Sequence, residues 1–231
     1  MKVVVGERRL GMDRLVLLVG PSGSGKTTIA KELEKEGYNI IHSYTTRPPR
    51  EPDEWGHTFI PQLTDRKISY IGHSGLGILN IEGYMEYEDE FGKKAEIPYI
   101  YYNSEVIAHK ELYGEHYWAT KEQYQGKGTS IYVVDPSGAE QVRQNVKDAE
   151  IITIYLTADE SIRYQRICSR ELKKYKEVSI GKRMIINIEA DERIQEDKKI
   201  FSKCKCDYVV DANRELEQVV TDIKEIIKES N

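Results

Sequence analysis

Residues 20–27 read GPSGSGKT, and this short segment constrains the fold more than any other part of the chain. It has the spacing GxxxxGK followed by Ser or Thr, and it stands between the apolar run Arg14–Val19 and the helical pattern Thr27–Glu36, which Gly37 ends. A continuous apolar run is typical of a strand that is buried on both faces. The segment therefore predicts a strand, a glycine loop and a helix in direct succession.

The same alternation of apolar strands and helical patterns returns after residue 130. Two helix starts carry a capping box, Ser137 with Glu140 and Thr157 with Glu160. Repeated strand and helix units with apolar strands form parallel sheets that helices cover on both faces. The sequence thus predicts an α/β fold with a doubly wound parallel sheet. The further expected elements are strands at 131–134, 151–156 and 208–210 and helices at 137–146, 157–169 and 216–227.

The glycine loop is suited to hold the phosphates of a nucleoside triphosphate. Glycines let successive backbone N–H groups turn inward on phosphate oxygens, and the start of the following helix favours an anion. Lys26 supplies a mobile positive charge for the terminal phosphates, and Thr27 supplies a hydroxyl for Mg²⁺. ATP is the expected donor and GTP the alternative. The expected nucleotide-binding residues are Gly20, Ser22, Gly23, Ser24, Gly25, Lys26, Thr27 and Thr28.

The charge balance argues against a general affinity for nucleic acid or for an anionic membrane. The 231 residues include 34 Lys and Arg against 39 Asp and Glu, a net charge of −5. The longest apolar run, Leu15–Val19, is far shorter than the roughly 20 residues that cross a bilayer. The three cysteines, Cys168, Cys204 and Cys206, are an odd number, which argues against a disulfide framework, and no further cysteines or histidines complete a zinc set. We expect a single domain of a cytoplasmic protein.

A second group of candidate anion ligands follows the predicted helix. Residues 43–50 read SYTTRPPR, which places Arg47 and Arg50 three apart on a proline-stiffened loop beside hydroxyl residues. Two guanidinium groups held in this way form a fork of donors suited to a second phosphate. An ordinary solvated loop with two arginines explains the same residues equally well.

The interval 59–117 differs from the rest of the chain. Short β-like runs at 68–71, 78–81 and 99–102 alternate with turn clusters such as Gly72–Gly75. We expect this interval to form a mixed β insertion in the α/β fold.

Together these motifs resemble the guanylate kinase family. The matches are collinear and cover most of the chain outside the insertion. They are the glycine loop, SYTTRPPR at 43–50, HYWATKE at 116–122, VVDPSGA at 133–139 and an arginine-bearing segment from 166 to 183. The resemblance implies a P-loop NTPase fold with an acceptor-binding β insertion and a helical lid. It also implies in-line transfer of a phosphoryl group from Mg-ATP to the phosphate of GMP.

The resemblance assigns an acceptor site to this chain. Ser43, Arg47 and Arg50 would hold the acceptor phosphate, and Thr120 and Asp135 would contact the guanine edge. Guanine presents N–H donors at N1 and N2, so a buried carboxylate that accepts both rejects adenine. A glutamate would complete the base site. Glu86, in YMEY, is preferred, and Glu111 is the competing register.

The resemblance also assigns a lid. Arg166, Arg170 and Arg183 follow the order of the family's lid arginines, and with Lys26 they would neutralise charge on the transferring group. A charged, exposed helix face is the alternative for Arg170 and Arg183.

Three residues depart from the family pattern. Trp118 stands where a tyrosine is expected and His57 lies near the place of another, so two phenolic donors to phosphate are missing. Val133 replaces an aspartate, so water-mediated support of Mg²⁺ must come from Asp135 or from elsewhere. The insertion is also longer than in the family.

Phosphorylation of GMP is the leading hypothesis, and two alternatives stay open. One is a kinase of the same fold with another nucleotide or a sugar phosphate as acceptor. The other is a non-catalytic binding module that holds a phosphorylated peptide on the acceptor face. The expected partners are ATP and GMP, in a monomer or homodimer. The expected parts are a core at about 12–42, 130–160 and 206–231, an acceptor-binding insertion at about 43–125 and a lid at about 161–200.

Overall fold

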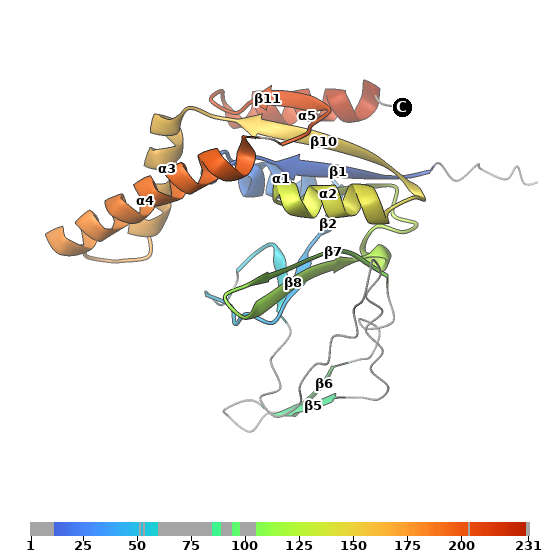
Figure 1. Cartoon of the computed structure of the whole chain (residues 1–231), viewed down its shortest axis with the longest axis horizontal. Coiled ribbons are helices and arrows are strands. Elements are labelled where there is room, and N and C mark those ends of the chain that lie inside the picture. Colours follow the sequence, from blue (N-terminus) through green and yellow to red (C-terminus); the bar gives the residue numbers. More distant parts are fainter. Residues whose placement is uncertain are drawn as a thin grey trace, which may run out of the picture.

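The computed structural model describes residues 12–50, 52, 54–59, 85–88, 94–97, 105–202 and 204–229. At its centre lies a five-stranded sheet in the order β11-β10-β1-β9-β2 (Figure 1). Every neighbouring pair in this sheet is parallel. The strands are β1 (Asp13–Val19), β2 (Asn39–Ile41), β9 (Thr129–Val133), β10 (Ala149–Thr157) and β11 (Tyr208–Asp211).

Both faces of the central sheet are covered by helices. Helices α1 (Lys26–Lys35) and α5 (Leu216–Glu229) contact each other and share one apolar core, which includes Val16 and Leu18 of β1. Helix α2 (Pro136–Asn145) packs on the opposite face, where Leu15, Leu17 and Val19 point. Successive side chains of β1 thus enter two different cores, as the pleat of a strand dictates. The predicted doubly wound α/β fold is confirmed.

Helices α3 (Glu160–Leu172) and α4 (Ile180–Phe201) pack on one another and extend beyond one end of the sheet (Figure 1). Their shared core is small and consists of Ile167, Cys168, Ile186, Ala190 and Ile194. Helix α4 has 22 residues and is the longest helix of the described residues. No helix among the described residues is both long and apolar enough to cross a bilayer.

A second sheet lies to one side of the first (Figure 1) and has the order β4-β3-β8-β7. Strands β3 and β4 are parallel and the other pairs antiparallel, which agrees with a mixed β insertion. The runs at 68–71, 78–81 and 99–102 lie outside the described residues. The strands are β3 (Ser43–Thr45), β4 (His57–Phe59), β7 (Val106–Leu112) and β8 (Glu115–Thr120), and β5 (Met85–Glu88) pairs with β6 (Lys94–Ile97). A short 3₁₀ helix, η2 (Lys121–Gln123), follows β8.

Both expected capping boxes are wrong, because each helix uses an aspartate as its N-cap. Asp135 caps α2 by accepting the Gly138 N–H at 2.7 Å, and Pro136 takes the first helical position, where its missing N–H costs nothing. Helix α3 is preceded by Asp159, whose N–H donates to Asn213 Oδ1 at 2.8 Å. The end of α1 is as expected, with Gly37 at φ +92°.

The core between α1, α5 and the sheet gives a direct test of this arrangement. Ile223 of α5 is completely buried there, so Ile223→Ala should lower the free energy of unfolding by about 2–5 kcal/mol in urea titration. Glu225→Ala, at an exposed position of the same helix, is the control and should change stability by less than about 0.5 kcal/mol. A small effect at Ile223 would mean that α5 does not pack on the sheet as described.

Candidate functional site

Most of the candidate residues follow the carboxyl ends of parallel strands. Because the five central strands run in one direction, their carboxyl ends meet at a single edge of the sheet. The glycine loop follows β1, the arginine-bearing segment 43–50 follows β2, Asp135 follows β9, and α3 follows β10. The fold therefore assembles segments that are far apart in the sequence beside the end of β1.

The glycine loop has a backbone that other residues could not adopt. Gly23 has φ +78° and Gly25 has φ +96°, in the left-handed region that favours glycine. At Gly20, a Cβ atom would lie 2.5 Å from the Leu156 carbonyl oxygen. Helix α1 starts at Lys26 with no side-chain cap among the described residues and no acidic residue in its first turn. Its first N–H groups are thus suited to an anion.

Lys26 is folded back on its own loop. Its ammonium group donates to the Gly20 carbonyl at 2.5 Å and to the Pro21 carbonyl at 3.0 Å. Burial lowers the pKa of Lys26 to about 8, against the opposing attraction of the Asp197 carboxylate. Thr27 is exposed at the start of α1. Thr28 is exposed as well, whereas the Ser24 hydroxyl is buried without a hydrogen-bond partner among the described residues.

Helices α3 and α4 hold the tip of the glycine loop. Arg166 donates to the Gly23 carbonyl at 3.2 Å and to the Ala212 carbonyl at 2.9 Å. Two residues that the sequence did not nominate hold Ser22. Arg163 Nε donates to the Ser22 carbonyl at 2.8 Å, and Asp197 Oδ2 accepts the Ser22 N–H at 2.8 Å. Arg163 lies one helical turn before Arg166, and this spacing was a weak sequence signal that both arginines face the glycine loop.

The other two expected lid arginines lie on the surface. The side chain of Arg170 is 55% exposed, and its Nε lies 3.3 Å from Glu171 Oε1. Arg183 is exposed in the first turn of α4. The structure thus brings Arg166 into contact with the loop, and the positive charge of Arg170 is close enough to help lower the pKa of Lys26. Arg183 makes no contact with the loop among the interactions of the described residues.

Arg47 lies in a closed polar network within the second sheet. Its guanidinium forms a two-point contact with the Glu54 carboxylate, at 2.7 and 3.1 Å. Its Nε donates to the Tyr117 hydroxyl at 3.1 Å, and its Nη1 also donates to the Pro48 carbonyl at 2.7 Å. The sequence did not identify Glu54 or Tyr117 as partners of Arg47. They lie 7 and 70 positions after it, and no local sequence pattern links residues at these distances.

The Glu54 carboxylate therefore already pairs with the guanidinium that was expected to bind a phosphate. Besides Arg47, it accepts the Arg50 N–H at 2.7 Å. Desolvation raises the pKa of the Glu54 carboxyl, but the hydrogen bonds from Arg47 and Arg50 outweigh it and lower that pKa. The Arg50 side chain is exposed, and Ser43 Oγ lies 3.1 Å from the Tyr132 hydroxyl.

The expected base-reading residues lie in different surroundings. Thr120 is fully buried, and its N–H donates to Gln123 Oε1 at 3.0 Å. Asp135 caps α2 and also pairs with Lys110. Glu111 is exposed and faces His116 in the register of β7 and β8. Glu86 belongs to β5, outside the second sheet.

Two of the departures from the family pattern are aromatic side chains of the second sheet, Trp118 and His57. Trp118 is 5% exposed and packs on Tyr44, with ring centroids 5.6 Å apart. His57 contacts the Tyr117 ring edge to face, and burial, followed by the charge of Arg47, lowers its pKa. His57 is thus neutral at pH 7 beside Arg47, where a cationic imidazole would repel the guanidinium.

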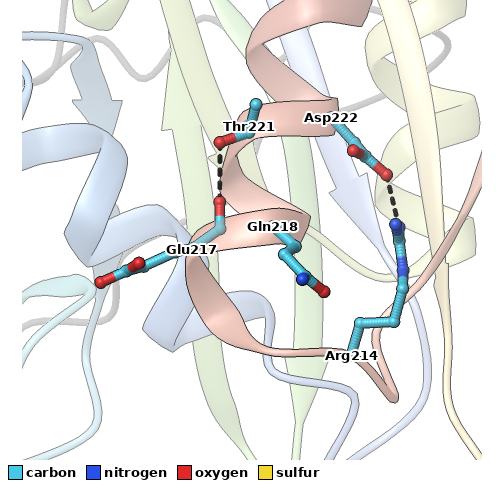
Figure 2. Close-up of a pocket in the computed structure, with 5 residues that line it drawn as sticks. All are labelled: Arg214, Glu217, Gln218, Thr221 and Asp222. Atoms are coloured by element: carbon cyan, nitrogen blue, oxygen red, sulfur yellow. Dashed lines mark hydrogen bonds and ion pairs between the residues drawn. The ribbon is translucent and has the colours of Figure 1, made fainter.

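A hollow beside the start of α5 does not coincide with these residues (Figure 2). The Arg214 guanidinium at its rim pairs with Asp222, and Thr221 Oγ1 donates to the Glu217 carbonyl at 2.8 Å. Its polar groups are largely paired with one another. Among the described residues, no cluster of three or more His, Cys, Asp or Glu side chains is arranged to hold a metal ion, and the three cysteines are free thiols.

Comparison with known proteins gives consistent results. The chain is 26% identical over 220 residues to a guanylate kinase of Nitrosomonas europaea, covering 94% of this chain and 90% of that protein. It is 23% identical over 218 residues to a guanylate kinase of Clostridium tetani, covering 86% and 90%. A guanylate kinase of Sus scrofa is 43% identical over 53 residues, covering 22% and 27%. No model of a known protein family matches the chain.

A solved structure supports the fold. The guanylate kinase from Anaplasma phagocytophilum superposes with a TM-score of 0.52 at 16% identity, covering 95% of this chain and 86% of that one. The bacterial relatives align over nine-tenths of their own length, and the parallel sheet, glycine loop and helix pair have the arrangement that the resemblance implied. The chain is thus similar to guanylate kinases along most of its length.

Proposed function

We propose that this protein transfers the γ-phosphoryl group of ATP to GMP, giving ADP and GDP. The observation that carries the proposal is the shared sheet edge. A glycine loop that starts a helix and an arginine segment from the next strand follow parallel strands whose carboxyl ends lie together. Its relatives are guanylate kinases along most of their length. The three free cysteines suit a reducing compartment, so we propose that it acts in the cytoplasm.

The donor would bind along the glycine loop and the start of α1. The left-handed glycines, the uncapped helix start and the buried Ser24 hydroxyl fit a polyphosphate. Lys26 would leave the Gly20 and Pro21 carbonyls for the phosphates. Thr27 would hold Mg²⁺, which supplies charge neutralisation between the β and γ phosphates. The proposed donor residues are Gly20, Ser22, Gly23, Ser24, Gly25, Lys26, Thr27 and Thr28.

The acceptor would bind at the segment after β2. Ser43, Arg47 and Arg50 are the proposed phosphate ligands, with the Arg47 Nε oriented by the Tyr117 hydroxyl. The Tyr117 hydroxyl also supplies a phenol in a region where Trp118 has none. Thr120, Asp135 and Glu86 are the proposed contacts to the base. Asp135 would have to exchange its pairing with Lys110 for the guanine edge.

Catalysis would consist of positioning and charge neutralisation. The bond from the γ phosphorus to the β–γ bridging oxygen breaks while a GMP phosphate oxygen bonds to the same phosphorus. Lys26, Arg166, Arg170 and Arg183 would carry the positive charge that this step needs. We propose that α3 and α4, within the lid at about 161–200, bring these arginines over the core, which faces the acceptor insertion at about 43–125.

Lys26→Ala tests the donor site. Because the ammonium is the mobile charge of the loop, the substitution should lower kcat by about 10²–10³ while leaving the circular dichroism spectrum unchanged. ADP release with ATP and GMP measures turnover, and Lys31→Ala, on the exposed side of α1, is the matched control. A folded Lys26 variant of ordinary activity would exclude the loop from catalysis. The same assay with AMP, CMP and UMP tests the acceptor, and turnover with one of these but not with GMP would overturn the proposal.

Arg47→Ala tests the acceptor phosphate site. The loss of one charge-assisted contact should raise KM for GMP by about tenfold or more and leave KM for ATP within about twofold. Steady-state kinetics with each substrate varied in turn gives both constants. An equal rise in the two constants would contradict the assignment of Arg47 to GMP.

Glu54→Gln tests the occupancy of the arginine fork. A phosphate that binds Arg47 must compete with the Glu54 carboxylate, so the neutral amide should lower KM for GMP by about fivefold. Glu105→Gln is the control, because its carboxylate pairs with Lys121 at 3.4 Å instead. If KM rises in Glu54→Gln, the carboxylate orients Arg47 and does not compete with the substrate.

A further inference from the structure

A buried ion pair between the two lid helices fastens the glycine loop. Arg163 of α3 and Asp197 of α4 are 5% and 6% exposed, and their closest charged atoms are 2.6 Å apart. The same two side chains hold both peptide groups of Ser22, its carbonyl through Arg163 Nε and its N–H through Asp197 Oδ2, each at 2.8 Å. Arg163 and Asp197, which lie 141 and 175 positions after Ser22 in the sequence, thus both contact its backbone.

The main chain of α3 makes the contact close. Gly23 follows Ser22 with φ +78°, and a Cβ there would lie 2.7 Å from the Arg163 carbonyl oxygen. The next arginine along the helix, Arg166, donates to the Gly23 carbonyl. Two arginines one turn apart on α3 therefore take two successive carbonyls of the loop.

The direction of these contacts matters for anion binding. A loop that turns N–H groups toward an anion turns carbonyls away from it, and those carbonyls need donors of their own. Arg163 supplies one from the outside of the loop. Its own charge is balanced by Asp197, because a buried guanidinium without a carboxylate would be strongly unfavourable.

We propose that Arg163 and Asp197 are positioning residues for the donor nucleotide, which fix the Ser22 peptide groups and tie the glycine loop to α4. Neither side chain needs to touch the nucleotide. Their effect passes through the backbone of residues 22 and 23, so it falls on the donor and not on the acceptor. This inference rests on the proposed function only in taking the glycine loop as the donor site.

The test replaces the pair as a whole. A single substitution would leave an unpaired buried charge, and the resulting loss of stability would hide any effect on nucleotide binding. Apolar residues of similar size at both positions preserve the packing and remove both charges. Arg163→Met combined with Asp197→Leu should therefore keep a thermal midpoint close to that of the unchanged protein. It should weaken ADP binding in calorimetry and raise KM for ATP, each by about tenfold, with KM for GMP within about twofold.

The chain contains a matched control pair. Arg143 of α2 and Asp207, just before β11, are 2.9 Å apart and hold Thr153 of β10 in a similar way. Asp207 accepts the Thr153 N–H at 2.7 Å, and Arg143 donates to the Thr153 hydroxyl at 2.7 Å. Arg143→Met combined with Asp207→Leu removes an equivalent clamp away from the glycine loop and should leave both Michaelis constants within about twofold.

A second variant keeps the test valid if the double variant does not fold. Arg163→Lys retains the charge opposite Asp197, but one ammonium does not reproduce the planar fork that spans the carboxylate and the Ser22 carbonyl. It should raise KM for ATP by several-fold and spare KM for GMP.

Three results would overturn the proposal. They are unchanged donor affinity in the folded variants, an equal rise in both Michaelis constants, and the same donor defect in the control pair. Calorimetry with ADP does not involve the acceptor. Binding of ADP without phosphorylation of GMP would therefore overturn the proposed acceptor while leaving the positioning test intact.

Discussion

The pairing of four successive carbonyls with cationic donors is the constraint on which the proposed donor site depends. Each of these carbonyls meets a cationic donor, from Lys26 for the first two, Arg163 for the third and Arg166 for the fourth. They belong to Gly20, Pro21, Ser22 and Gly23. Glycine is required at position 20 because Leu156 lies against it, and at 23 because α3 does. Of these three donors, Lys26 belongs to the loop itself, so it can change partners while Arg163 and Arg166 keep the loop bound to α3.

The two proposed anion sites differ in the source of their attraction for phosphate. At the donor loop, the attraction comes from backbone dipoles and a helix start that no side chain of the described residues caps. At the acceptor segment, the attraction comes from the full charge of Arg47, which Glu54 already neutralises in the present structure. Phosphate at the first proposed site would bind to an uncapped set of N–H groups. Phosphate at the second would replace the Glu54 carboxylate, and this exchange would lower the gain from each phosphate contact.

Local pattern was enough to predict the central fold. The apolar run of β1, the glycine loop and the periodicity of α1 are properties of neighbouring residues, and the later strands β9, β10 and β11 were predicted from the same alternation. The capping boxes failed because Asp135 and Asp159 lie two residues before or after the residues that fit the pattern, and the pattern does not weigh one candidate cap against another. Pro136 directly after Asp135 was the local signal for the first of them.

The contacts around the candidate site were harder to predict, since they join residues that are distant in sequence. Asp197 gives no sign in its own helix that it accepts the Ser22 N–H. Glu54 is close to Arg47, yet the two-point contact depends on how β3 and β4 lie side by side. The charged partners of both proposed anion sites, Asp197 and Glu54, could therefore be identified only from the three-dimensional structure.

The length of α4 separates its first turn from its attachment at Asp197. Arg183 lies fourteen residues before Asp197, which at 1.5 Å per residue places it about 21 Å along the helix axis. A tilt of about 15° around the buried end would carry Arg183 through about 5 Å, by the same geometry. Any tilt of α4 relative to the glycine loop would thus displace Arg183 far more than Asp197, and α3 would have to move with it, because Ile186, Ala190 and Ile194 pack on α3.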